Sequence, residues 1–134
     1  MLKQQFTLYL ENRPGELARI TKKLALEKVN LDGISVANSP DVALVQLVVS
    51  NAAATRRVLK SDGVAFTEQK VVLVPLENKP GSLAEVVTHL GKAKININYV
   101  YATACEGKKG CSSYAVISTP ALKKVEDVWK KVAG

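Results

Sequence analysis

The side chains best suited to bind a small molecule occur in one loop motif that the chain contains twice. The segment ENRPGELA occupies residues 11–18, and ENKPGSLA occupies residues 77–84. In each copy the Asn side chain offers both a hydrogen-bond donor and an acceptor. The Pro-Gly pair that follows favours a tight turn that a ligand could approach closely. The motif therefore predicts two loops able to hold a small polar ligand.

Each loop runs into a helical pattern and is followed, further along, by an Asn that opens a predicted strand. The first N–H groups of a helix lack intrahelical partners and carry partial positive charge, so this place favours a carboxylate. Asn30 and Asn96, at the start of the strands, offer the same donor and acceptor groups as the loop Asn residues. The alternative is that all these Asn residues only shape turns by bonding their own backbone.

The loops belong to a longer internal repeat. An offset of 66 aligns residues 11–37 with 77–103 without a gap, and nine of the 27 positions are identical. The identical pairs are Glu11/Glu77, Asn12/Asn78, Pro14/Pro80, Gly15/Gly81, Leu17/Leu83, Ala18/Ala84, Leu24/Leu90, Lys28/Lys94 and Asn30/Asn96. A repeat of this length predicts two copies of one structural unit.

Hydrophobic periodicity predicts the same order of elements in each copy. The first copy has predicted strands at 6–10, 30–38, 41–50 and 64–69, with helices after the loop and at 51–61; the second has strands at 71–76, 96–104 and 112–119, with helices after the loop and at 119–132. The pattern indicates an α+β fold of two tandem ferredoxin-like βαββαβ domains with antiparallel sheets, residues 1–69 and 70–134. The second copy lacks its last strand, which would leave an open sheet edge for a partner.

Composition limits the classes of function. The 134 residues carry a net charge of +7, shared by both halves without a basic block, which disfavours a nucleic-acid or membrane patch. No apolar run approaches the roughly 20 residues that span a bilayer, and no secretory signal is visible. We therefore expect a cytoplasmic protein.

Residues that often carry catalysis do not form a recognisable set. Cys105 and Cys111 flank a predicted hairpin tip; they could be two free thiols, a disulfide or part of a metal site, and the lack of a visible export signal favours free thiols. His89 is the only His and lies within a predicted helix. No phosphate-binding, zinc or catalytic motif is present. We expect a non-enzymatic protein without a cofactor or a metal.

The repeated strand, N-x-P-G-x-L loop, amphipathic helix and strand-opening Asn resemble the ACT domain, over residues 6–37 and 72–103. This family consists of regulatory domains that bind small ligands, mostly amino acids, between two neighbouring domains. The resemblance implies these ligand-binding residues: Asn12, Pro14, Gly15, Glu16, Leu17, Asn30, Asn78, Pro80, Gly81, Ser82, Leu83 and Asn96. A His that some members carry two residues before the loop Asn is absent, since Leu10 and Leu76 stand there.

The resemblance implies a regulatory module that binds an amino acid at an interface between ACT domains and modulates a metabolic enzyme or its own assembly. A homodimer is expected, joined through the open edge of the second copy. The two loops need not be equivalent, because Glu16 in the first is replaced by Ser82 in the second. The alternative is an RNA-binding ferredoxin-like module, although the predicted strands offer few aromatic residues for stacking. A phosphate-transforming enzyme on the same fold would need a phosphate-binding loop that the chain lacks.

Overall fold

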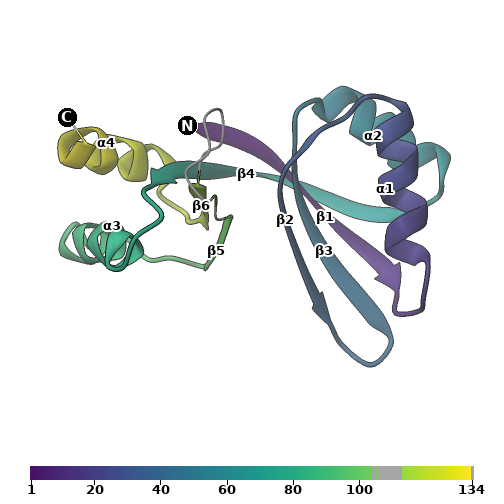
Figure 1. The fold of residues 1–134 in the computed structure, drawn as a ribbon, viewed down its shortest axis with the longest axis horizontal. Helices are drawn as coiled ribbons and strands as arrows, with labels where there is room; N and C mark the ends of the chain where they lie inside the picture. Colours follow the sequence, from purple (N-terminus) through teal and green to yellow (C-terminus); the bar gives the residue numbers. More distant parts are fainter. Residues whose placement is uncertain (104, 106–112, 134) are drawn as a thin grey trace. The chain divides into compact units, whose positions relative to one another are not determined.

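The computed structural model describes residues 1–103, 105 and 113–133. The chain divides into two compact units (Figure 1). The N-terminal unit consists of Gln4–Gln69, and the C-terminal unit consists of Met1–Lys3 together with Lys70–Gly134. Each unit is described by itself below.

The N-terminal unit follows the predicted βαββαβ order. Its elements are β1 (Leu2–Glu11), α1 (Glu16–Leu26), β2 (Leu31–Asn38), β3 (Val42–Val49), α2 (Ala52–Ser61) and β4 (Ala65–Leu76), of which β1 and β4 also contribute residues to the C-terminal unit. The strand order is β2-β3-β1-β4, and β3 pairs antiparallel with both of its neighbours. The predicted ferredoxin-like fold is confirmed.

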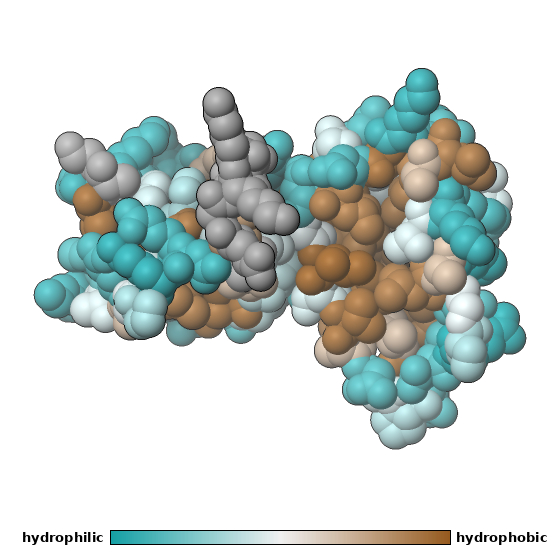
Figure 2. Space-filling model, in the orientation of Figure 1, coloured by the Kyte–Doolittle hydropathy of each residue, from teal (hydrophilic) through white to brown (hydrophobic). Residues whose placement is uncertain are grey.

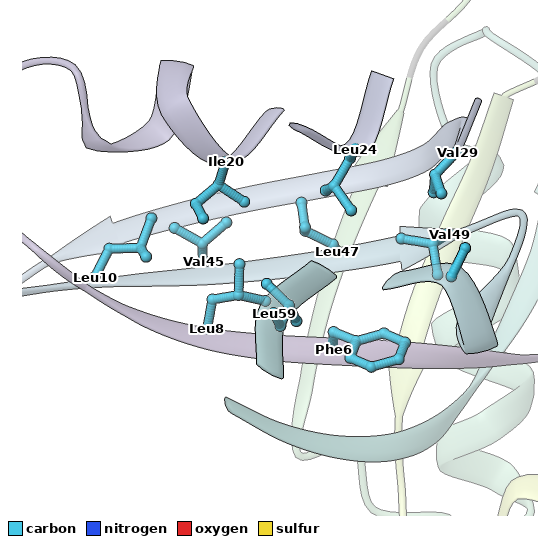
Figure 3. Close-up of a cluster of buried hydrophobic side chains, with 11 residues drawn as sticks. Phe6, Leu8, Leu10, Ile20, Leu24, Val29, Val45, Leu47, Val49 and Leu59 are labelled. Carbon is cyan, nitrogen blue, oxygen red and sulfur yellow. The ribbon is translucent and has the colours of Figure 1, made fainter. Parts of the chain in front are cut away.

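Alternating apolar residues place one face of this sheet against α1 and α2 (Figure 3). Within α1, the buried residues are Ile20 and Leu24, spaced one helical turn apart. The cluster of buried residues comprises Phe6, Leu8, Leu10, Ile20, Leu24, Val29, Val45, Leu47, Val49, Ala54 and Leu59. At the start of α2 the side chain of Asn51 accepts a hydrogen bond of 3.0 Å from the Ala54 N–H, which caps the helix.

The C-terminal unit repeats the arrangement with the second half of β4, α3 (Ser82–Lys92), β5 (Tyr99–Thr103), β6 (Ser113–Ser118) and α4 (Leu122–Ala133). Strand β6 pairs antiparallel with β4 on one side and with β5 on the other. The core beneath the helices comprises Val72, Val74, Val86, Leu90, Ile95, Ala115, Ile117 and Val125. Strand β5 begins at Tyr99, later than the predicted start at residue 96.

The open edge expected beside β4 is already paired, so that expectation was wrong. The Leu73 N–H donates a hydrogen bond of 2.8 Å to the Met1 carbonyl, and the Met1 amino group donates one of 3.1 Å to the Leu73 carbonyl. Residues Met1–Lys3 thus occupy the position in the C-terminal sheet that the last strand of the repeat, β4, occupies in the N-terminal unit. The first residues of the chain complete the sheet of the C-terminal unit.

No helix in the described part of the chain is long and apolar enough to cross a membrane.

Candidate functional site

The two repeated loops have the same backbone geometry. Gly15 and Gly81 precede α1 and α3 with φ angles of 88° and 91°, in the left-handed region that residues other than Gly rarely adopt. A Cβ atom added at either Gly would meet nothing within 4 Å, so the φ angle alone accounts for Gly here. Neither helix has a side-chain cap. The N–H groups of Glu16 and Ser82 donate to the Arg13 and Lys79 carbonyls at 3.5 and 3.3 Å, so only the next N–H groups of the first turn are left to water or to a ligand.

The loop Asn residues hold the loops in place. The Nδ2 atom of Asn12 donates a hydrogen bond of 3.1 Å to the Ser39 carbonyl, and that of Asn78 donates one of 2.8 Å to the Cys105 carbonyl. Both bonds span 27 residues and use the amide nitrogen. The amide oxygen can still accept a hydrogen bond from a ligand. The turn-shaping interpretation and the ligand-binding one are therefore compatible.

The strand-opening Asn residues lie at the far end of the first helix of each unit. Asn30 follows α1, which has 11 residues and is therefore about 16 Å long. Its Nδ2 atom donates a hydrogen bond of 2.9 Å to Asp32 Oδ1, and its backbone N–H donates one of 2.8 Å to Ser50 Oγ. The backbone carbonyl of Asn96 accepts a hydrogen bond of 2.7 Å from Thr119 Oγ1. Within one unit, the structure does not bring these Asn residues next to the loop.

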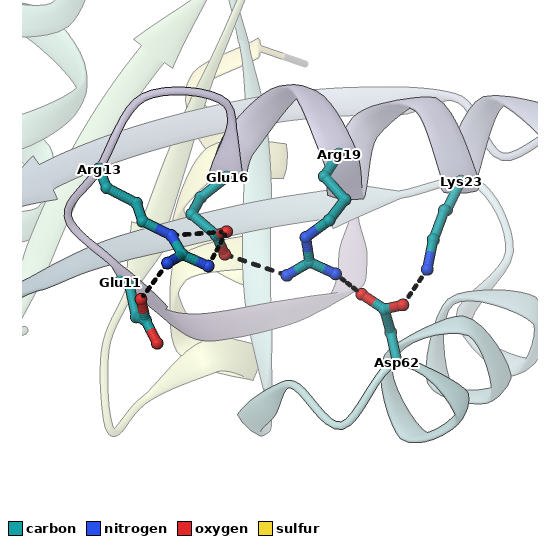
Figure 4. Close-up of polar contacts among 6 residues, drawn as sticks. All are labelled: Glu11, Arg13, Glu16, Arg19, Lys23 and Asp62. Atoms are coloured by element: carbon teal, nitrogen blue, oxygen red, sulfur yellow. Dashed lines mark hydrogen bonds and ion pairs between the residues drawn. The ribbon is translucent and has the colours of Figure 1, made fainter.

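A chain of ion pairs surrounds the first turn of α1 (Figure 4). The Glu16 carboxylate forms ion pairs with the guanidinium groups of Arg13 and Arg19, with an N–O distance of 3.0 Å in each. Arg19 and Lys23 both pair with Asp62, just after α2. Hydrogen bonds from Arg19 and then Arg13 hold the pKa of Glu16 below its ordinary value. A side-chain carboxylate with two cationic partners therefore already occupies the start of α1.

The corresponding turn of α3 has different chemistry. Ser82 replaces Glu16, and its Oγ atom is buried without a hydrogen-bond partner among the described residues. Glu85 replaces Arg19, which reverses the charge at that position. Lys79, which replaces Arg13, pairs at 2.8 Å with Glu77 on the exposed surface.

A cavity of about 460 Å³ adjoins this turn within the C-terminal unit, and we call it the α3–α4 cavity. It is lined by Pro75, Leu76, Glu77, Lys79, Ser82, Glu85, Val86, Trp129 and Val132. Of the loop residues predicted from sequence, it includes Ser82. Sequence reasoning missed Glu85, for which the charge reversal between aligned Arg19 and Glu85 was the signal available.

The remaining predicted residues are distributed over the outer parts of the loops. Leu17 and Leu83, in the first turns of α1 and α3, are exposed, at 36% and 40%. Exposed apolar side chains at a helix start could contact a ligand or a neighbouring domain.

Two aromatic residues lie on the face of the C-terminal sheet opposite its core. Tyr99 and Tyr101 stack with ring centroids 6.3 Å apart. Tyr101 lies opposite Val116, whereas the next residue along β6, Ile117, belongs to the core, so the Tyr rings face away from it. Burial, with a smaller effect of Tyr99, raises the pKa of Tyr101 above its ordinary value.

Cys105 is disulfide-bonded, which corrects the expectation of a free thiol. Cys111 lies outside the described residues. Among the described residues, no group of three or more His, Cys, Asp or Glu side chains could hold a metal ion.

Comparisons with known proteins define the family. The chain consists of two ferredoxin-like domains in tandem. Each has the same Pro-Gly loop before its first helix. A family model described as an ACT domain pair matches residues 1–129, and this chain belongs to that family. No curated protein sequence matches it.

Solved structures show the same fold. A crystal structure of a protein from Bacteroides thetaiotaomicron is 28% identical, with a TM-score of 0.87, over 99% of this chain and 90% of that chain. The ligand-free regulatory subunit of aspartate kinase from Thermus thermophilus is 16% identical, with a TM-score of 0.70, over 98% of this chain and 94% of that chain. The corresponding regulatory subunit from Thermus flavus is 17% identical, with a TM-score of 0.61, over 100% and 96% of the two chains.

Proposed function

We propose that this ACT domain pair is a non-catalytic regulatory protein of the cytoplasm that binds an amino acid and thereby modulates a metabolic enzyme or its own assembly. The observation that carries the proposal is the duplicated loop. Each copy has a helix start without a side-chain cap, preceded four residues earlier by an Asn whose amide nitrogen holds the loop, in a chain that matches an ACT domain pair over residues 1–129. Likeness in fold to regulatory subunits of aspartate kinase supports a partner enzyme of amino-acid metabolism.

The ligand would bind where a loop of one domain meets a neighbouring domain. The loop would supply the residues named from sequence: Asn12, Pro14, Gly15, Glu16 and Leu17 in one copy, and Asn78, Pro80, Gly81, Ser82 and Leu83 in the other. Asn30 and Asn96 would be contributed by the facing domain, since each lies far from the loop of its own unit. Binding would act on a partner only through a difference in affinity between two states of the protein.

We further propose that the two loops bind with different affinity. A ligand carboxylate at the start of α1 would meet the Glu16 carboxylate and compete with it for Arg13 and Arg19. At the start of α3 the small, uncharged Ser82 leaves that place open. The C-terminal loop is therefore the less obstructed of the two proposed amino-acid sites.

A thermal-shift panel of the twenty amino acids at millimolar concentration tests the proposal. A ligand at 100 times its Kd adds about 2.7 kcal/mol of stability, which raises Tm by several degrees in a protein of this size. We expect one or two amino acids to raise Tm. The increase should shrink more in Asn78→Ala than in Asn12→Ala, each compared with the same variant without ligand.

Two results would contradict the proposal. A flat panel would mean that the loops only shape the fold or that the ligand is not an amino acid. A shift that survives both Asn substitutions would place the ligand elsewhere.

A further inference from the structure

We propose that the α3–α4 cavity is a second binding site, which takes a small primary amine with an apolar body and a positively charged ammonium head. This cavity lies inside the C-terminal unit, between the end of β4, the first turn of α3 and the last turns of α4. It does not need a facing domain. The inference does not rest on the proposed amino-acid site, although the two sites share Ser82.

The size and the apolar wall of the cavity fit the body of such a ligand. Its volume of about 460 Å³ lies within the range of roughly 300–1,000 Å³ that is typical of small-molecule sites. One side is formed by Val86, Val132 and the indole of Trp129. Behind them, Val86 and Trp129 pack on the core that contains Val74, so the wall is continuous with the hydrophobic interior. An apolar group entering this space leaves water for an apolar surface.

The polar head of the ligand has an unused hydrogen-bonding atom to meet. Ser82 Oγ is buried and has no hydrogen-bond partner among the described residues, and Ser82 lines the cavity. Buried polar atoms are nearly always hydrogen-bonded in folded proteins, because an unpaired one loses its contacts with water. A ligand N–H group that donates to Ser82 Oγ would supply the missing partner.

The charges of the cavity favour a cation. Three charged residues line it, and two of them, Glu77 and Lys79, form an ion pair with each other at 2.8 Å. The third, Glu85, is exposed, and the structure records no hydrogen bond or ion pair to its carboxylate among the described residues; the pKa of Lys79 is raised by Glu77 and, to a smaller extent, by Glu85. Two carboxylates and one ammonium give these three side chains a net negative charge, so an ammonium group is favoured over a neutral or an anionic head of the same size.

The N-terminal unit shows why the repeat does not duplicate this site. The positions of Ser82 and Glu85 are taken there by Glu16 and Arg19, which pair with each other at 3.0 Å. A ligand at that place would have to break the ion pair. The substitution of both partners in the C-terminal unit removes the pair and leaves space and charge in its place.

Tryptophan fluorescence tests the inference directly, since Trp129 is the only Trp in the chain and lines the cavity. The full-length protein is titrated with three probes of similar size: 2-phenylethylamine, 2-phenylethanol and 3-phenylpropionate. We expect the amine to change the emission of Trp129 with an apparent affinity about tenfold tighter than the alcohol. The carboxylate probe should bind more weakly than the alcohol.

The matched variants are Glu85→Gln and Glu27→Gln. Both remove one negative charge, but Glu27 is an exposed residue at the end of α1 in the other unit. Glu85→Gln should bring the affinities for the amine and the alcohol to within about twofold of each other, and Glu27→Gln should leave the tenfold preference intact. Urea unfolding followed by the same fluorescence verifies that the C-terminal unit, which contains the cavity, is folded in both variants.

Three results would overturn the inference: no change in Trp129 emission with the amine, equal affinity for the amine and the alcohol in the wild type, or an unchanged preference in Glu85→Gln. These outcomes are separate from those of the amino-acid panel. If the amine binds but no amino acid raises Tm, the cavity site is retained and the proposed amino-acid site is rejected. If an amino acid raises Tm but the amine does not bind, the amino-acid site is retained and the cavity site is rejected.

Discussion

At the scale of single residues, the two units differ most at the first turn of their first helix. In the N-terminal unit Glu16 lies between two guanidinium groups, and its side chain is 12% exposed. In the C-terminal unit the same backbone carries Ser82 and Glu85. One loop geometry thus supports a closed ion-pair network in one copy and an open cavity in the other.

The lowered pKa of Glu16 predicts a pH-dependent contribution to stability. A carboxylate whose pKa is lower in the folded than in the unfolded state stabilises the fold above its unfolded pKa of about 4.3, and this contribution is lost as pH falls through the folded pKa. Glu16→Gln should therefore lower Tm at pH 7. The difference in Tm between the wild type and the variant should shrink as pH falls below about 4.

Glu27→Gln is the control for this prediction, because the structure records no ion pair for Glu27 among the described residues. It should change stability by no more than about 0.5 kcal/mol at neutral pH. A Glu16→Gln variant that melts like the wild type at pH 7 would show that the network adds nothing to the stability of the fold.

The left-handed Gly residues give a second prediction. Gly81→Ala should destabilise the C-terminal unit by about 1–2 kcal/mol, because a Cβ atom at φ 91° clashes with its own backbone even though the surrounding space is open. Urea unfolding followed by the fluorescence of Trp129 reports on this unit. Gly91→Ala is the matched control.

Gly91 lies inside α3, also with open space around an added Cβ, but its φ angle is not positive. Its change to Ala should raise the stability by about 0.5–1 kcal/mol, since Gly is unfavourable within a helix. Opposite signs for the two substitutions would identify backbone conformation as the cause. A loss of the same size at both positions would point to lost space instead.

At the scale of elements, the completion of the C-terminal sheet by Met1–Lys3 has a measurable consequence. A chain that begins at Gln4 loses the two backbone hydrogen bonds between Met1 and Leu73. We expect the C-terminal unit to lose about 1–3 kcal/mol, at about 0.5–1.5 kcal/mol for each bond. The exposed edge of β4 should also increase self-association.

Leu2→Ala serves as the control for this truncation, because it keeps the backbone of the strand and changes a side chain that is 39% exposed. Its cost should stay below about 1 kcal/mol. Equal losses in the two proteins would assign the effect to the Leu2 side chain, and an unchanged unfolding midpoint in the truncated chain would argue against the strand completion.

The elements that sequence reasoning predicted correctly are those with local signals. The Pro-Gly loop and the apolar spacing of Ile20 and Leu24 lie within one short segment, and they indicate the strand, the turn and the helix together. The pairing of Met1 with Leu73 joins residues 72 positions apart, and nothing in either segment marks it.

The candidate site also has a part that the sequence predicted and a part that it did not. The loop geometry at Gly15 and Gly81 was predictable, since an N-x-P-G motif needs a residue that tolerates positive φ. The α3–α4 cavity was not, because it depends on how Trp129 in α4 packs against α3, more than forty residues earlier in the chain. The aligned substitutions marked a difference between the copies without showing that it opens a space.

At the scale of the whole molecule, the internal duplication is that of the ACT domain pair family, to which the chain belongs. Each unit alone has a small hydrophobic core. The two cores are separate clusters, each beneath its own pair of helices. Each unit can therefore carry its own substitutions at the repeated loop. This independence allows the two loops to differ in chemistry within one fold.

The expected homodimer remains a prediction, now based on a different edge. In the N-terminal unit β2 is the last strand of the sheet order, and Ile34 and Val36 on it are 41% and 49% exposed. Figure 2 shows apolar side chains gathered on the visible face of this unit, over β2 and β3. An edge strand with exposed apolar side chains is a template for pairing with a second chain. We therefore expect sedimentation at twice the 14.4 kDa mass of one chain.

Charge at the strand edge should prevent this association, because a second strand would have to bury the added ammonium group. Val36→Lys should shift the protein to a monomer at concentrations where the wild type is dimeric. Leu26→Lys makes the same chemical change at a residue of α1 that is 82% exposed and away from the edge, and it should leave the dimer intact. A wild-type protein that sediments as a single 14.4 kDa species at high concentration would reject the homodimer. A dimer that tolerates Val36→Lys but not Leu26→Lys would assign the contact to the helices instead of the β2 edge.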